Sequence, residues 1–234
     1  MTVEFENQQV SEYLLKKNLP LDLLYEIKDH MISQIYHLQN EEGLSFEEAF
    51  EKTKISWQSE LKMVSTGWFT KREIPILYKR ILGKNQIEMH KKAFFLSGVF
   101  VFILLGFSHI FSKEVFIDIY GVLASVLAGS AIINNIYYWR IIKSTFKKYN
   151  RKTSIYQKSA YDMHIAPIMI ILLIMDYENK AEKLYILFNE GNFGEYFTHT
   201  ASFLIIYTYI AYLVYGFLNF TQYRKALDQY KISV

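Results

Sequence analysis

The stretch that decides the fold is Ala93–Phe111, which reads AFFLSGVFVFILLGFSHIF. It contains no charged side chain unless the imidazole of His109 is protonated. A helix rises about 1.5 Å per residue, so about 20 apolar residues cross the roughly 30 Å hydrocarbon core of a bilayer. The length and composition of this stretch therefore predict a transmembrane helix. The alternative is a buried helix of a soluble protein, and three similar stretches argue against it.

These three stretches have comparable length and patterned flanks. They are Val115–Trp139, with Asp118 as its single acid, Ala160–Tyr177, which is the shortest, and Ala201–Phe220, which is uncharged and rich in tyrosine. We therefore predict an all-α polytopic membrane protein with a transmembrane domain over residues 93–220. Its four spans are predicted at residues 93–111, 115–139, 160–177 and 201–220.

Basic residues alternate from one side of these spans to the other. Lysine and arginine dominate residues 71–92 and the tail at 221–234, and residues 140–158 contain seven bases and no acid. Residues 176–200 instead contain five acids and two bases. By the positive-inside rule, both termini are predicted to be cytoplasmic. No basic n-region precedes an apolar core in the first 30 residues, so no cleavable signal peptide is expected.

Residues 1–70 have a different character, with 12 acidic and 6 basic residues and a net charge of −6. Apolar residues recur at spacings of three and four along Leu21–Asn40, which predicts an amphipathic helix. A shorter helix is predicted over Gln8–Lys17. Such short helices are not stable alone, so we predict that they pack together as a small cytoplasmic helical domain.

Turn signals follow the longer of these helices. Gly43 suits a left-handed helix stop. The sequence Ser-Phe-Glu-Glu at 45–48 then matches a capping box, in which the serine oxygen and a glutamate carboxylate bind free amides at a helix start. The helix that begins here is predicted to place apolar residues as far as Trp57 and Leu61 on one face.

Several features of this region occur together. They are the Leu-Pro pair at 19–20, the acidic stretch Glu26-Ile27…Asp29-His30, the turn Glu42-Gly43-Leu44-Ser45 and the helix start Glu47-Glu48-Ala49-Phe50. On these features, the stretch from Tyr13 to about Leu61 resembles the HAAS-type signalling domain found ahead of bacterial membrane segments. The resemblance implies a regulatory or assembly role, often beside PadR-like transcription regulators or transport genes. It implies no catalytic residue.

Residues 71–92 are predicted to form a basic amphipathic linker that lies on the anionic inner leaflet. Each basic side chain near such a surface contributes about 1 kcal/mol to binding. The same reasoning applies to residues 140–158. The alternative is that these charges only set the topology, and nucleic-acid binding is not expected. The residues predicted to contact lipid headgroups are Lys79, Arg80, Lys147, Lys148, Arg151 and Lys152.

Four residues with metal-binding side chains fall near the outer ends of the four predicted spans. Imidazole and carboxylate groups suit zinc or another divalent cation, so these residues form a candidate metal site. The alternative is that they are interfacial residues in contact with water and headgroups. The four residues are His109, Asp118, Asp176 and His199.

The second predicted span carries small residues at every fourth position, namely Gly121, Ser125 and Gly129. Small residues at this spacing let helix backbones approach closely in a membrane, where lipid supplies no hydrophobic drive for association. We therefore predict that this face packs within the bundle. Dimerisation through the same face, which would make a homo-oligomer, is the alternative.

The composition and motifs limit the classes of function. The absence of cysteine excludes disulfides and thiolate catalysis, and no nucleotide-binding loop or hydrolase motif occurs. We predict no enzyme, no catalytic residue and no cofactor. Frequent Lys, Ile, Asn, Tyr and Phe suggest an AT-rich bacterial genome. The leading prediction is a regulatory or assembly protein of the bacterial inner membrane that binds a protein partner through residues 1–65. The alternatives are a subunit of an oligomeric transporter or channel and a metal-dependent intramembrane enzyme.

Overall fold

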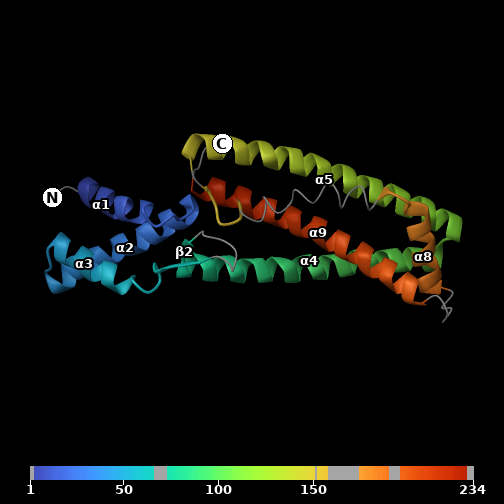
Figure 1. Cartoon of the computed structure of the whole chain (residues 1–234), viewed down its shortest axis with the longest axis horizontal. Helices are drawn as coiled ribbons and strands as arrows, with labels where there is room; N and C mark the ends of the chain where they lie inside the picture. The colour runs from blue at the N-terminus through green and yellow to red at the C-terminus, as the bar shows by residue number, and fades with distance from the viewer. Residues whose placement is uncertain (1–2, 66–72, 151, 158–173, 190–195, 231–234) are drawn as a thin grey trace. The chain divides into compact units, whose positions relative to one another are not determined.

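The computed structural model describes residues 3–65, 73–150, 152–157, 174–189 and 196–230. Figure 1 shows the order of its elements, which are helices apart from one short hairpin. The chain divides into two compact units. The first unit comprises residues 1–86, 144–157 and 223–234, and the second comprises residues 87–143 and 158–222.

The first unit begins with three helices, α1 (Val3–Leu15), α2 (Leu21–Glu42) and α3 (Phe46–Ser56). The predicted helix over Leu21–Asn40 is confirmed, and its apolar stripe is buried. Helix α1 begins five residues before the predicted start at Gln8. The three helices pack on one another, as the instability of isolated short helices requires.

The turn between α2 and α3 is confirmed in detail. Gly43 follows α2 with a φ of 66°, in the left-handed region that glycine adopts without a steric penalty. The Glu48 amide donates to Ser45 Oγ at 3.3 Å, and the Ser45 amide donates to Glu48 Oε2 at 3.0 Å. This capping box fixes the start of α3.

The prediction that α3 continues to Leu61 is wrong, because the helix ends at Ser56. The Ser56 hydroxyl donates to the Thr53 carbonyl, a local side-chain bond that offers the backbone an alternative to further helix. Leu61 is nevertheless buried, because the chain turns back toward the core. Strand β1 (Met63–Ser65) follows and pairs antiparallel with β2 (Glu73–Pro75), a hairpin that the sequence analysis missed.

One hydrophobic core joins the first unit, and it extends beyond the predicted domain over residues 1–70. Besides α1, α2 and α3, it includes Ile74 of the hairpin, Tyr78 and Leu82 of the following helix, and Ile155. All of these side chains are less than a tenth exposed. The N-terminal helices therefore share their interior with segments that lead directly into the long apolar helices.

Among the described residues, three helices are long and apolar enough to cross a membrane: α4 (Ile76–Ile110), α5 (Lys113–Tyr149) and α9 (Tyr196–Gln229). They contain the predicted spans at 93–111, 115–139 and 201–220, apart from Phe111 at the end of the first. Most of the predicted linker over 71–92 forms the first part of α4. The predicted span at 160–177 falls mainly outside the described residues.

The second unit has an apolar interior and an apolar exterior. Only 22% of the most apolar window of each long helix is buried, and side chains such as Phe95, Phe102 and Ile133 are at least 70% exposed. Large exposed apolar surfaces of this kind are typical of contact with lipid. The second unit also contains the shorter helix α8 (Tyr177–Asn189).

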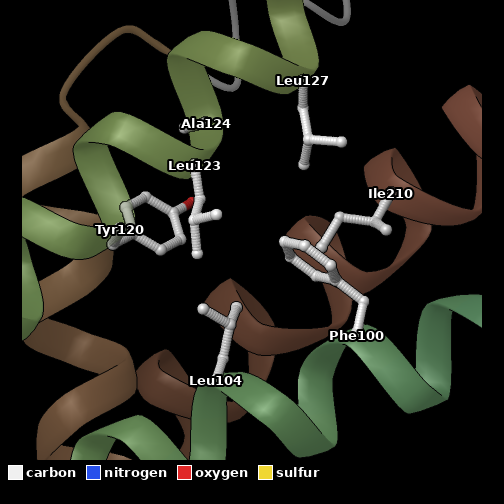
Figure 2. A pocket seen from close by; sticks show the side chains of 7 residues that line it. All are labelled: Phe100, Leu104, Tyr120, Leu123, Ala124, Leu127 and Ile210. Atoms are coloured by element: carbon white, nitrogen blue, oxygen red, sulfur yellow. The ribbon is translucent and has the colours of Figure 1, made fainter.

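Figure 2 shows side chains of α4, α5 and α9 converging in the interior of this unit. They surround a space of about 10 Å³, which has room for no more than one water molecule. The interior is thus closely packed here, and this space is too small to bind a ligand. Its lining residues are Phe100, Leu104, Tyr120, Leu123, Ala124, Leu127 and Ile210.

Candidate functional site

The start of α2 is held by residues 152–157, the segment that follows α5. Pro20 occupies the N-cap position and supplies no side-chain bond to the first amides of the helix. Those amides instead donate to backbone carbonyls, Leu21 to Lys152 at 3.1 Å and Asp22 to Thr153 at 3.2 Å. Free amides at a helix start normally bind a capping side chain or water. Here a distant stretch of backbone completes the helix.

The Asp22 carboxylate binds the same segment in return. Its Oδ2 accepts from the Ile155 amide at 3.0 Å, and its Oδ1 accepts from the Leu23 amide at 2.7 Å. The Ser154 side chain also donates to it. Asp22 is 5% exposed, so this carboxylate depends on protein donors rather than on water.

Burial raises the pKa of Asp22 to about 6. The bonds from Ser154, Ile155 and Leu23 act in the opposite direction, and the nearby charge of Glu26 raises the pKa slightly further. Desolvation penalises the ionised form of a buried carboxyl group, and hydrogen bonds to that form favour it. The carboxylate is therefore ionised at neutral pH, but at a cost in free energy.

A second set of hydrogen bonds connects the same segment to the ends of α5 and α9. The Tyr223 hydroxyl lies 3.0 Å from Thr145 Oγ1 and 2.9 Å from Thr153 Oγ1. Gln157 Oε1 accepts from the Thr153 amide at 2.8 Å. All four side chains are buried. Residues Asp22, Thr145, 152–157 and Tyr223 are called the Asp22 junction below.

A stacked aromatic pair supports the same attachment. The ring of Tyr25 on α2 stacks on that of Tyr230, just beyond the end of α9, with centroids 6.0 Å apart and planes at 28°. Buried hydrogen-bond networks that are fully satisfied hold their elements in one arrangement. The Asp22 carboxylate is buried and already occupied by protein donors. The Asp22 junction therefore attaches the start of α2 to residues 152–157 and, through Thr153, to the ends of α5 and α9.

The four predicted metal ligands are not brought together. Among the described residues, which include all four, no group of three or more His, Cys, Asp or Glu side chains is placed to hold a metal ion. His109, Asp118 and Asp176 are exposed, whereas His199 is buried. Asp176 accepts a hydrogen bond from the Asn179 side chain at 2.7 Å. The exposure of His109, Asp118 and Asp176 agrees with the interfacial alternative, whereas the burial of His199 does not.

The small residues of α5 pack differently from one another. A Cβ atom on Gly121 would lie 2.6 Å from Tyr177 Cε2, so this glycine permits close approach of the aromatic ring. Ser125 is exposed, and no described atom lies within 4 Å of the Cβ position at Gly129. The small residues that α5 buries are Ala124 and Ala128, on the neighbouring face. The predicted stripe is therefore a packing face only at Gly121.

The predicted headgroup-binding residues fall into two groups. Arg80 binds both carboxylate oxygens of Glu60, at 2.8 and 2.9 Å, and Lys79 donates to the Ser65 carbonyl at 3.1 Å. These two side chains therefore bind within the first unit. Lys147 and Lys148 on α5 are exposed, and Lys152 is partly exposed. Arg151 lies outside the described residues.

Comparison with known proteins gives no match: no family model, no curated protein and no solved structure resembles the chain significantly. The similarity of residues 13–61 to HAAS-type domains therefore stays a prediction. The Asp22 junction joins residues that are far apart in the sequence. Sequence reasoning missed it because Asp22 and Ile155 are 133 positions apart.

Proposed function

We propose that this chain is a regulatory or assembly protein of the bacterial inner membrane that binds a protein partner through its N-terminal helices. In this proposal the chain crosses the membrane four times, and both termini and the Asp22 junction are cytoplasmic. The three apolar helices and the alternation of basic flanks support the topology. The proposal assigns no catalytic role to any residue.

The single observation that carries this proposal is the Asp22 junction. It fastens the first turn of α2 to the segment that follows α5 and to the end of α9. A partner that binds α1, α2 or α3 and shifts the start of α2 must therefore disturb its backbone bonds to Lys152 and Thr153. Through Thr153 it also disturbs the hydrogen bond to Tyr223 near the end of α9. A coupling of this kind lets partner binding and the state of the membrane helices influence each other.

The charge of the N-terminal helices indicates the kind of partner. Residues 1–70 carry a net charge of −6, and acids such as Asp29 on α2 and Glu47 on α3 are exposed. Complementary charge steers association and selects among partners. The partner surface is therefore expected to be basic.

A cavity of about 360 Å³ in the second unit gives little support to the alternative of an ion channel. Its described lining is apolar except for Ser130 and Asn134 on α5. Ion pathways are built from carbonyl groups or charged side chains that replace the water around the ion. The described lining offers few such groups, so partner binding remains the function that we propose.

Affinity purification in mild detergent tests the proposed partner binding. Deleting residues 1–65 would expose the core around Tyr78 and Leu82, so point variants of the full chain are the better probe. We expect one basic partner to co-purify with the wild type in constant ratio. It should be lost from the double charge reversal Asp29→Lys/Glu47→Lys.

The matched control makes the same domain more acidic, through Lys16→Glu and Lys62→Glu, two exposed lysines. This control should retain the partner. Recovery of the chain alone, or equal recovery of the partner with both double variants, would contradict the proposal that the acidic helices bind it.

Cysteine labelling tests the proposed topology, because the natural chain contains no cysteine. Single cysteines replace the exposed residues Glu178 on α8 and Lys62 in the first unit. In intact cells, a membrane-impermeant maleimide should label the Glu178→Cys variant and spare the Lys62→Cys variant until the membrane is opened. The reverse pattern would overturn the orientation.

A further inference from the structure

The basic side chains of α5 differ from those of α4 in what they contact. Lys79 and Arg80 on α4 bind a carbonyl and a carboxylate of the first unit. Arg140 and Lys143 on α5 are exposed, and in the described part of the chain neither forms an ion pair. The positive charge of these two side chains is therefore available to a ligand outside the protein.

These two bases continue an exposed apolar face of the same helix. One side of α5 carries residues at spacings of three and four, namely Ile133, Ile136, Trp139 or Arg140, and Lys143. The first three of these side chains are 70%, 51% and 53% exposed. The face thus changes from apolar to basic within about one turn, and the change occurs at a tryptophan.

The geometry at this change is specific. Lys143 Nζ lies 4.8 Å from the centroid of the Trp139 ring, within the range of a cation–π contact. This contact directs the ammonium group back along the helix toward the apolar face. Tryptophan is enriched at the boundary between hydrocarbon and headgroups, and lysine side chains extend to that boundary.

We propose that Trp139, Arg140 and Lys143 form a binding site for the headgroup of an anionic phospholipid. The proposal rests on the membrane location proposed above. The guanidinium of Arg140 presents a planar fork of donors that matches a phosphate, and Lys143 adds a point charge. The acyl chains of the bound lipid lie along Ile133 and Ile136, and the indole ring of Trp139 lies at the level of the glycerol.

Quenching of Trp139 fluorescence tests this site directly. The full chain carries Trp57→Phe and Trp68→Phe, which leave Trp139 as its only tryptophan. It is reconstituted in phosphatidylcholine vesicles that contain a small fraction of brominated phosphatidylglycerol or, separately, brominated phosphatidylcholine. We expect the anionic lipid to quench Trp139 more strongly than the zwitterionic lipid at equal bromine content.

The double variant Arg140→Gln/Lys143→Gln should abolish this difference, because the loss of two basic contacts near the membrane lowers the preference for anionic lipid roughly 30-fold. The control Lys16→Gln/Lys62→Gln removes the same charge from the first unit and should keep the difference. A variant that fails to insert into the vesicles would be quenched by neither brominated lipid. Quenching by brominated phosphatidylcholine must therefore persist in the double variant.

Three results would overturn the proposal. The first is equal quenching of the parent chain by the two brominated lipids. The second is a preference for the anionic lipid that persists in Arg140→Gln/Lys143→Gln. The third is displacement of brominated phosphatidylglycerol by inorganic phosphate at moderate concentration, which would make the site one for soluble phosphate rather than for lipid.

Discussion

Protonation of Asp22 should strengthen the Asp22 junction. The pKa of this carboxyl rises from the ordinary 3.8 to about 6 in the folded chain because the group is buried. One pKa unit corresponds to about 1.4 kcal/mol, so complete protonation of Asp22 stabilises the folded state by about 3 kcal/mol. The folded state binds the proton more tightly than the unfolded state does. This stabilisation is fully present below pH 3.8 and is lost as the pH rises through about 6.

The same two pKa values give the expected change in the stability of the junction between pH 5 and pH 7. At pH 5, one unit below the folded pKa, the junction is more stable than at pH 7 by about 1.4 kcal/mol, which is a tenfold change in its opening equilibrium. Other groups that face Asp22 are Glu26 on α2 and the phenols of Tyr223 and Tyr230. Of these, the phenols stay neutral over this range.

Hydrogen–deuterium exchange of the peptide that contains residues 152–157 measures this opening. After correction for the intrinsic pH dependence of exchange, protection of this peptide should be about tenfold higher at pH 5 than at pH 7. A peptide from α3, where the capping box lies far from Asp22 in the chain, serves as the internal reference.

The variant Asp22→Asn supplies the control. Leu23 and Ile155 donate to different oxygens of Asp22, and asparagine replaces one of these oxygens with an NH2 group that cannot accept. One hydrogen bond worth about 1 kcal/mol is therefore lost, but the side chain carries no charge to desolvate. Its protection should therefore be independent of pH over this range. The reasoning is refuted if acidification loosens residues 152–157 in the wild type, or if Asp22→Asn retains the full pH dependence.

Three further predictions concern thermal unfolding of the full chain in detergent, followed by tryptophan fluorescence. Gly121→Ala should destabilise the chain by about 1–3 kcal/mol, because its Cβ would overlap the Tyr177 ring, whereas Gly129→Ala should be nearly neutral; equal effects would contradict this packing. Tyr223→Phe should cost about 1–3 kcal/mol through the loss of hydrogen bonds at the Asp22 junction, and an unchanged melting temperature would count against it. Tyr120→Phe should be neutral or stabilising, because this buried hydroxyl has no hydrogen-bond partner among the described residues; a loss of stability comparable to that of Tyr223→Phe would show that a partner exists.

Local features of the fold could be predicted from the sequence because their causes are local. The capping box at Ser45, the left-handed Gly43 and the apolar stripe of α2 depend on residues within one or two turns. The three apolar helices follow from composition over about 20 residues. The hairpin escaped prediction because strands of three residues are too short to show an alternating pattern.

Helix ends and partners were harder to predict for a physical reason. Hydropathy marks where a helix leaves the hydrocarbon, but backbone hydrogen bonding continues into water, so α5 extends ten residues beyond the predicted span end at Trp139. Small residues on α5 lie on two adjacent faces, and only the packing partner decides which face is buried. The Asp22 junction depends on contacts across 133 positions, which no local pattern encodes.

The distant capping of α2 has a consequence for how the protein is made. A chain emerges from the ribosome at about 5–20 residues per second, and its N-terminal part folds first. The 133 positions between Asp22 and Ile155 correspond to a delay on the order of ten seconds. During that delay, the first turn of α2 is without its backbone partners and Asp22 remains in water. Completion of α2 therefore reports that α4 and α5 have been synthesised, and a chain that stalls between them would expose an unfinished helix start to quality-control proteases.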